Sequence, residues 1–251
     1  MTTMLGIFPF AGHGMHVFRP ECRDGLATIA GTDRRASVGA WLRDLPTNAF
    51  AFDQDLPIGQ RMGPIVEWLR SRPLGAKRVD VLGIYCHGYP TGLQLGVTLR
   101  TPKRPSNLDA FADALVAAGL HARSSIGLMA CSTADGPHDK AAAGFLEGGP
   151  GGDDGFADAL RDALCARGLT SVRVYAHATA GHATRNPILR VFAGGGDTLG
   201  GTGGYYLVTR RSPRWSRWVR ALREAGPGAF RHRMLTMSDE QIHAELDAMP
   251  A

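Results

Sequence analysis

Hydrophobic and polar positions alternate along the middle of the chain with two different periods. Short apolar runs rich in β-branched and aromatic residues, such as RVDVLGIYC, are typical of buried strands. Stretches whose apolar residues recur every three or four positions, such as SNLDAFADALVAAGL, are typical of amphipathic helices. In chain order, the predicted elements are helix 60–72, strand 78–86, helix 106–120, strand 124–131, helix 155–168 and strand 170–179.

The ends of two of these helices carry recognisable signals. Ser106 or Asn107 can cap helix 106–120 at its start, because their short polar side chains can accept a hydrogen bond from the first turn. Gly119 and Gly168 can end the helices that precede them, because glycine tolerates the left-handed conformation common after a last turn. The helix boundaries are therefore predicted independently of the apolar pattern.

The order of the elements predicts an α/β fold. Helices that alternate with strands produce right-handed crossovers and a mostly parallel sheet flanked by helices on both faces. We expect TMLGIFPF to add a strand, and ILRVF and GYYLVT to form a hairpin across the glycine-rich segment 194–204. Helices at 213–225 and 238–248 then close a chain of 251 residues, which we interpret as a single domain.

Composition adds little that is specific. Hydrophobic residues make up 44% of the chain and charged residues 20%, as in an ordinary soluble globular protein. No apolar run approaches the roughly 20 residues of a membrane span, and the N-terminus lacks the basic leader of a signal peptide. We expect a cytoplasmic protein, or one exported by a leaderless route. The net charge of +5 favours anionic partners without indicating nucleic acid.

We interpret the four cysteines of the chain as free thiols. No CxxC pair suggests a zinc site, and nothing in the sequence indicates an oxidising compartment. Strand alternation turns Cys86 away from the side of its neighbour His87, so we expect Cys86 to be a packed core thiol. Cys165 lies in a predicted helix and is interpreted as structural.

Two of the predicted strands run into residues that can perform nucleophilic chemistry. Strand 78–86 leads into His87 and Gly88, and strand 124–131 ends at Cys131. The carboxyl ends of parallel strands meet at one edge of the sheet, where ligands bind in open α/β folds. A cysteine nucleophile needs a base, a proton donor for the leaving amine and donors for the oxyanion. Cys131 would attack, His87 would act as acid and base, and the backbone N–H groups of Gly88 and Cys131 would form the oxyanion hole.

This layout resembles that of the caspase-like cysteine peptidases. In that superfamily a strand ending in His-Gly, a helix and a strand ending in Ala-Cys or Gly-Cys follow one another, as around CHG and ACS here. The superfamily includes caspases, clostripain, gingipains, CHAT-domain proteases and the self-processing protease domains of bacterial toxins. The toxin domains are the most similar in layout, over residues 76–210.

The resemblance implies a caspase-like three-layer fold and a thiol endopeptidase that forms an acyl-enzyme. It also implies a protein or peptide substrate, no required cofactor or metal, and the role of a bacterial effector or toxin-like protein. Self-cleavage in the glycine-rich segment 144–155 would be consistent with it.

Other interpretations of the same residues exist. An ordinary α/β sheet with a turn histidine and a buried free cysteine would also contain the CHG and ACS sequences. A catalytically inactive caspase-like fold that binds proteins or polyphosphates would contain them too. The α/β-hydrolases use an early His-Gly and a G-x-[SC]-x-G nucleophile turn, but both glycines are missing around Cys131, so we reject that class. The His-Gly dipeptide alone does not indicate a catalytic histidine, because AGHGM near the N-terminus also contains it.

Several further side chains are candidates for the substrate pocket, namely Asp135, His177 and His182. In the resembling peptidases the loop after the cysteine borders the pocket for the residue before the cut bond. Acidic residues there would favour a basic substrate residue, although a solvated acidic loop is the simpler explanation. The two histidines could line the pocket or belong to a plain loop.

The segment RRSPRWSRWVRALRE predicts an amphipathic helix with a basic face. A solvated basic face is the plain explanation. Arginine side chains also bind phosphate and carboxylate well, and the resembling toxin domains are activated by inositol hexakisphosphate through a basic surface. An inositol polyphosphate is therefore a candidate activator, whereas no recognisable module suggests nucleic acid. The candidate anion-binding residues are Arg214, Arg217, Arg220 and Arg223.

Overall fold

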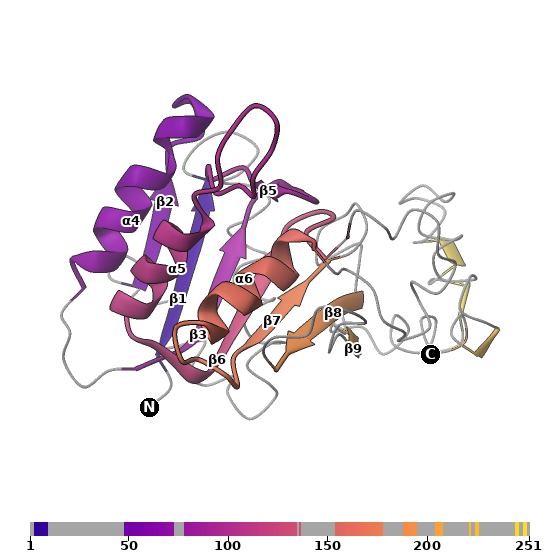
Figure 1. Cartoon of the computed structure of the whole chain (residues 1–251). Helices are drawn as coiled ribbons and strands as arrows, with labels where there is room; N and C mark the ends of the chain where they lie inside the picture. The colour runs from indigo at the N-terminus through magenta and orange to yellow at the C-terminus, as the bar shows by residue number, and fades with distance from the viewer. Residues whose placement is uncertain are drawn as a thin grey trace.

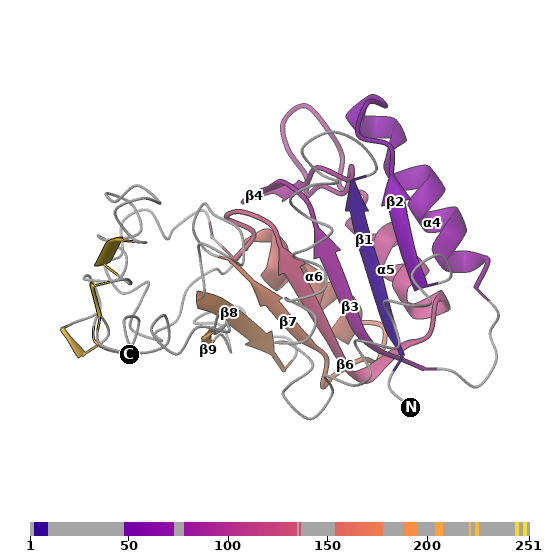
Figure 2. The same cartoon turned by 180° about the vertical axis from the view of Figure 1, so that it is seen from behind.

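The computed structural model describes residues 3–9, 48–72, 78–134, 136, 154–177, 188–194, 204–207, 221, 224–225, 244–245 and 248–249. Within these residues, seven strands form one sheet in the order β2-β1-β3-β6-β7-β8-β9 (Figures 1 and 2). The strands are β1 Met4–Pro9, β2 Ala49–Phe52, β3 Val79–Tyr85, β6 Leu120–Met129, β7 Arg173–Ala176, β8 Ile188–Ala193 and β9 Gly204–Leu207.

The pairing of the strands confirms the predicted α/β fold with a mostly parallel sheet. From β2 to β7 every neighbouring pair is parallel. The last two pairs, β7 with β8 and β8 with β9, are antiparallel, so the predicted C-terminal hairpin is confirmed as well. A hairpin is possible there because antiparallel strands need only a short return, whereas each parallel pair requires a crossover.

Three helices among the described residues pack on one face of the sheet: α4 Met62–Arg70, α5 Leu108–Ala117 and α6 Phe156–Cys165. Figure 1 shows them in front of the strands, and Figure 2 shows the opposite face of the sheet. Their apolar side chains form one core with alternate strand residues such as Ile84 and Leu128. The residues that point to the other face, such as Tyr85 and Met129, are also buried. Residues on both faces are therefore buried, which is compatible with a three-layer α/β fold, although the described α-helices cover one face and not the two that the sequence predicts.

The glycines at the helix ends act as predicted, whereas the N-cap residue of α5, Asn107, makes no capping hydrogen bond with its side chain. The Leu108 N–H at the start of α5 donates to the Ser106 hydroxyl at 3.3 Å. Gly119 and Gly168, which follow α5 and α6, have φ angles of 101° and 87°. Because this left-handed region is costly for residues with a Cβ atom, glycine is favoured at both helix ends.

One strand of this sheet and a separate two-stranded sheet were not predicted. Strand β2 has only four residues, three of them partly exposed, so it shows no clear period in the sequence. The short hairpin of β4 Gly88–Tyr89 and β5 Gly92–Leu93 consists largely of turn-forming residues. The predicted helices at 213–225 and 238–248 fall almost entirely outside the described residues.

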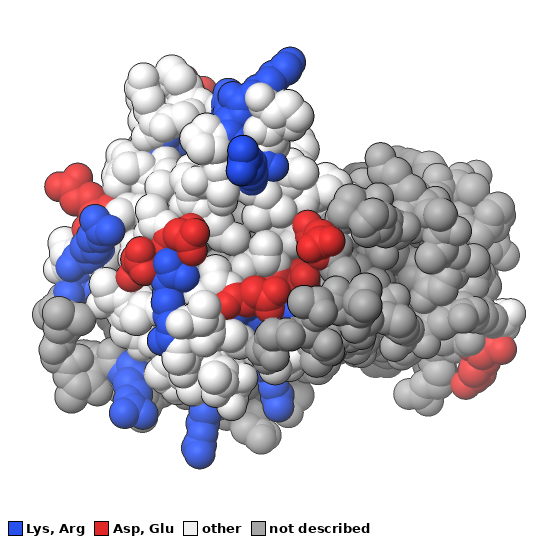
Figure 3. Space-filling model, viewed as in Figure 1, with Lys and Arg blue, Asp and Glu red and all other residues white. Residues whose placement is uncertain are grey.

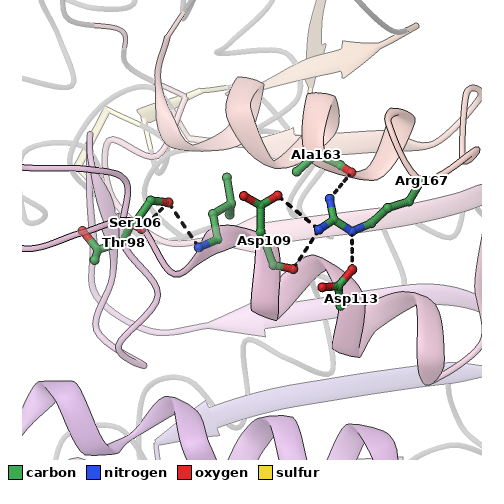
Figure 4. Close-up of polar contacts among 7 residues, drawn as sticks. Thr98, Ser106, Asp109, Asp113, Ala163 and Arg167 are labelled. Carbon is green, nitrogen blue, oxygen red and sulfur yellow. Dashed lines mark hydrogen bonds and ion pairs between the residues drawn. The ribbon is translucent and has the colours of Figure 1, made fainter.

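One arginine joins α5 to the end of α6 (Figure 4). Arg167 donates through Nε to Asp113 at 2.6 Å and through Nη2 to the Asp109 carboxylate at 3.1 Å. Its Nη1 group donates to the Ala163 carbonyl at 2.8 Å. The hydrogen bond from Arg167 holds the pKa of Asp113 below its usual value. These contacts fix α6 beside α5, and α6 in turn reaches the edge of the sheet where the predicted site lies.

Candidate active site

His87 and Cys131 follow neighbouring parallel strands. The last residue pair of the β3–β6 ladder is Tyr85 with Met129. His87 and Cys131 each lie two residues beyond this last pair, so both follow directly after the carboxyl ends of neighbouring parallel strands. The fold therefore brings the predicted pair together at the carboxyl edge of the sheet.

The two segments touch through their main chains at Gly88. A Cβ atom built on Gly88 would lie 2.5 Å from the Cys131 carbonyl oxygen and 2.7 Å from both Ala130 Cβ and Thr133 Cγ2. Gly88 is buried, while His87 before it is exposed. Only a residue without a side chain allows the histidine segment to lie this close to the cysteine turn.

We expect Gly88→Ala to lower the free energy of unfolding by about 1–3 kcal/mol, because the added methyl group must push the 130–133 turn away. Gly63→Ala is the matched control: no heavy atom lies within 4 Å of its Cβ position, and it occupies the first turn of α4. That variant should be as stable as the wild type or more so, since alanine is the better helix former. Urea unfolding of both variants measures the difference, and equal stabilities would contradict the close contact.

The main chain of His87 is held on both sides by Gln94. The His87 N–H donates to the Gln94 side-chain oxygen at 3.2 Å. The Gln94 N–H donates to the His87 carbonyl at 2.9 Å. Arg61, just before α4, donates through Nη1 to the Gln94 carbonyl at 2.9 Å. Neither Gln94 nor Arg61 was predicted, because both contacts depend on the path of the β4–β5 hairpin.

Cys131 is half-buried and begins a tight turn. Ser132 has a φ angle of 54°, a left-handed conformation that costs a serine about 1–2 kcal/mol. Hydrogen bonds within and beyond the turn hold it: Thr133 donates through its hydroxyl to the Ala130 carbonyl at 3.0 Å. The Ala134 N–H donates to the His177 carbonyl at 2.8 Å. Strained backbone that is fixed in this way is common at functional sites.

The N-terminus of α6 connects the histidine segment to the cysteine turn. The Phe156 N–H donates to the Pro90 carbonyl at 3.0 Å, and the Ala157 N–H donates to the Thr133 carbonyl at 2.9 Å. The first N–H groups of a helix have no partner within the helix, so they are available for such contacts. One helix end thus sets the position of both segments.

A buried ion pair fixes this end of α6. The Arg161 side chain is fully buried and pairs with Asp158, whose side chain is 6% exposed. Arg161 also donates through Nε to Asp162 at 2.8 Å. The other carboxylate oxygen of Asp158 accepts from the Asp154 N–H at 3.1 Å. Asp158 therefore ties the loop before α6 to an arginine inside the fold.

Cys86 and Cys165, which the sequence analysis interprets as structural, have the burial and the raised pKa of structural thiols. Cys86 is fully buried in the core, as predicted, and burial raises the pKa of its thiol to about 12. Burial also raises the pKa of the half-buried Cys165 thiol, which donates to the Gly194 carbonyl at 3.4 Å. A thiol with a raised pKa holds little thiolate near neutral pH and is a poor nucleophile.

The other candidate residues are only partly described. His177 directly follows β7 and is fully buried, with its carbonyl against the turn after Cys131. Asp135, His182 and the four arginines of the basic helix lie outside the described residues. In the part of the chain that the structure describes, no group of three or more His, Cys, Asp or Glu could hold a metal ion. No helix there is long and apolar enough to span a bilayer.

Comparison of the chain with models of protein families, with curated proteins and with solved structures found no match.

Proposed function

We propose that this protein is a cysteine endopeptidase with a Cys131–His87 dyad. The observation that carries the proposal is the parallel pairing of β3 and β6, whose carboxyl ends lie side by side just before His87 and Cys131. The contact of Gly88 with the Cys131 turn supports it further. We also propose membership of the caspase-like superfamily, on the strength of the CHG and ACS sequences and their order along the chain.

In the proposed reaction His87 accepts the proton of the Cys131 thiol as sulfur attacks the carbonyl carbon of the peptide bond. Backbone N–H groups of Gly88 and Cys131 stabilise the oxyanion. The C–N bond then breaks, and His87 gives the proton to the leaving amine. Water attacks the remaining thioester with His87 as base. The acid is released, and the thiol recovers its proton.

The exposure of the two groups suits this chemistry. His87 is exposed and Cys131 half-buried, so a polypeptide can reach both. The hydrogen bonds of Gln94 to His87, and of α6 to Pro90 and Thr133, fix the two segments before substrate arrives. Fixed positions of this kind lower the cost of bringing the reacting groups together.

Alkylation by iodoacetamide tests the dyad. We expect Cys131 to react fastest near neutral pH, and His87→Ala to slow its reaction by roughly tenfold or more, because the imidazole assists thiolate formation. Cys86 is the internal control, since its buried thiol with a pKa of about 12 should stay unmodified in both proteins. Peptide mapping by mass spectrometry gives the rate for each cysteine. Equal and slow alkylation of Cys131 in both proteins would falsify the dyad.

A peptide-library cleavage assay separates the peptidase from an inactive fold of the same kind. Cleavage that disappears in Cys131→Ala supports the enzyme. If Cys131 is reactive but no peptide is cut, the alternative of a protein- or polyphosphate-binding module is favoured.

A further inference from the structure

The loop between β5 and α5 carries three cations that have no anionic partner among the described residues. Arg100, Lys103 and Arg104 are all exposed. None of them belongs to an ion pair found in the described part of the chain. Figure 3 shows Lys and Arg side chains gathered over this loop, in a surface of mostly uncharged atoms. We call segment 100–104, which carries these three cations, the basic loop.

The main chain of the basic loop is ordered by its own hydrogen bonds. Thr101 and Arg104 exchange backbone hydrogen bonds of 2.9 and 3.2 Å. The Asn107 side chain accepts from the Thr98 N–H at 2.8 Å and donates to the Gly96 carbonyl at 2.8 Å. Because the loop is already ordered, binding a ligand would cost little main-chain entropy.

The basic loop lies on the side of the sheet where the candidate active site is. The Leu99 N–H donates to the Thr91 carbonyl at 2.8 Å, and Thr98 forms a bridge with Gly92. These contacts join the loop to the β4–β5 hairpin, which directly follows His87. Figure 1 shows the loop rising at the same end of the sheet as that hairpin. A polypeptide lying across His87 can therefore extend over the basic loop.

We propose that the basic loop is an exosite that binds an acidic stretch of the substrate polypeptide, away from the bond that is cut. The proposal rests on the peptidase function proposed above. Carboxylates fit better than a compact polyphosphate, because the N–H groups of Thr101 and Arg104 are already used within the loop. The main chain there offers no phosphate-binding nest, and only long, exposed side chains remain. Such side chains suit carboxylates spread along an extended chain.

The first test compares two peptide substrates that share a cleaved sequence but carry either a glutamate-rich or a glutamine-rich tail. We expect the glutamate tail to lower KM by about three- to tenfold at low salt with kcat unchanged, since exposed ion pairs are individually weak. Added salt should remove this advantage, because it screens exposed charges. Reversal of the basic loop, as Arg100→Glu, Lys103→Glu and Arg104→Glu together, should remove it as well.

The matched control reverses three exposed arginines at the opposite edge of the sheet. Arg78, Arg123 and Arg173 lie at or near the amino ends of β3, β6 and β7. Their replacement by glutamate changes the net charge equally and should preserve the preference for the glutamate tail. If both triple variants lose the preference alike, net charge explains it and the exosite is wrong. An unchanged preference in the basic-loop variant also overturns it.

A binding measurement separates this inference from the proposed enzyme activity. Fluorescence anisotropy of a labelled glutamate-rich peptide on Cys131→Ala protein should show salt-sensitive binding that the basic-loop reversal weakens. If that holds while no peptide is cleaved by the wild type, the peptidase fails and the acidic-peptide site stands. If the peptide does not bind, or inorganic polyphosphate alone binds at the loop, the exosite is contradicted even if the peptidase is active.

Discussion

Replacing Cys131 with alanine is expected to lower kcat/KM for a cleaved peptide by at least about a thousand-fold, because the acyl-enzyme can no longer form. His87→Ala should cause a loss of similar size, since the thiol then lacks its base and the leaving amine its proton donor. The two losses should not add. Residues that act in one step are strongly non-additive, so the double variant should be about as slow as either single variant.

The measurement is steady-state cleavage of a peptide found by library profiling, with each variant first shown to be folded by circular dichroism. Cys165→Ala is the control, because this half-buried thiol lies in α6 and donates to backbone carbonyls away from the edge of the sheet. It should retain nearly full activity. Wild-type rates in Cys131→Ala, or an equal loss in Cys165→Ala, would assign the activity to another group.

The candidate pair could be predicted from the sequence because its position depends on strand order alone. RVDVLGIYC and SSIGLMAC are recognisable as buried strands, and one helix lies between them. A single right-handed crossover then makes the two strands parallel, and it brings their carboxyl ends to one edge. Within this fold they are also direct neighbours, so His87 and Cys131 follow adjacent strands at that edge.

The groups that hold the pair could not be predicted in the same way. Gln94 and Arg61 reach His87 only through the β4–β5 hairpin, whose two-residue strands leave no periodic signal. Strand β2 was missed for a related reason, since its four residues gain their strand conformation by pairing with β1. Long-range contacts of this kind override local propensity.

Arg161 illustrates a further limit of the apolar pattern. In helix 155–168 the apolar residues Phe156, Leu160 and Leu164 recur every four positions as one stripe, and all three are buried. Arg161 adjoins that stripe and is fully buried too, although arginine is normally a surface residue. Burial is tolerated there because the guanidinium pairs with Asp158 and Asp162. Charge pairing inside the fold is not visible from hydrophobic periodicity.

We expect Arg161→Leu to lower the free energy of unfolding by about 3–5 kcal/mol, because it leaves the carboxylate of Asp158 buried without this guanidinium. Adding Asp158→Asn should recover a large part of the loss, since the remaining group is then uncharged. Arg167→Leu is the matched control: its partners Asp109 and Asp113 have side chains that are 81% and 58% exposed. Because exposed ion pairs contribute little, that variant should lose much less stability.

Urea unfolding of the wild type, Arg161→Leu, the double variant and Arg167→Leu measures these differences. The order of their free energies of unfolding decides the outcome. An Arg161→Leu protein as stable as Arg167→Leu would contradict a structural role for the buried pair. The loss should also reach the candidate site, because the end of α6 that Asp158 fixes donates to both Pro90 and Thr133. Alkylation of Cys131 should then lose part of its dependence on His87 in Arg161→Leu, even under conditions in which the protein remains folded. The double variant should restore that dependence together with stability, since both follow from the position of one helix end.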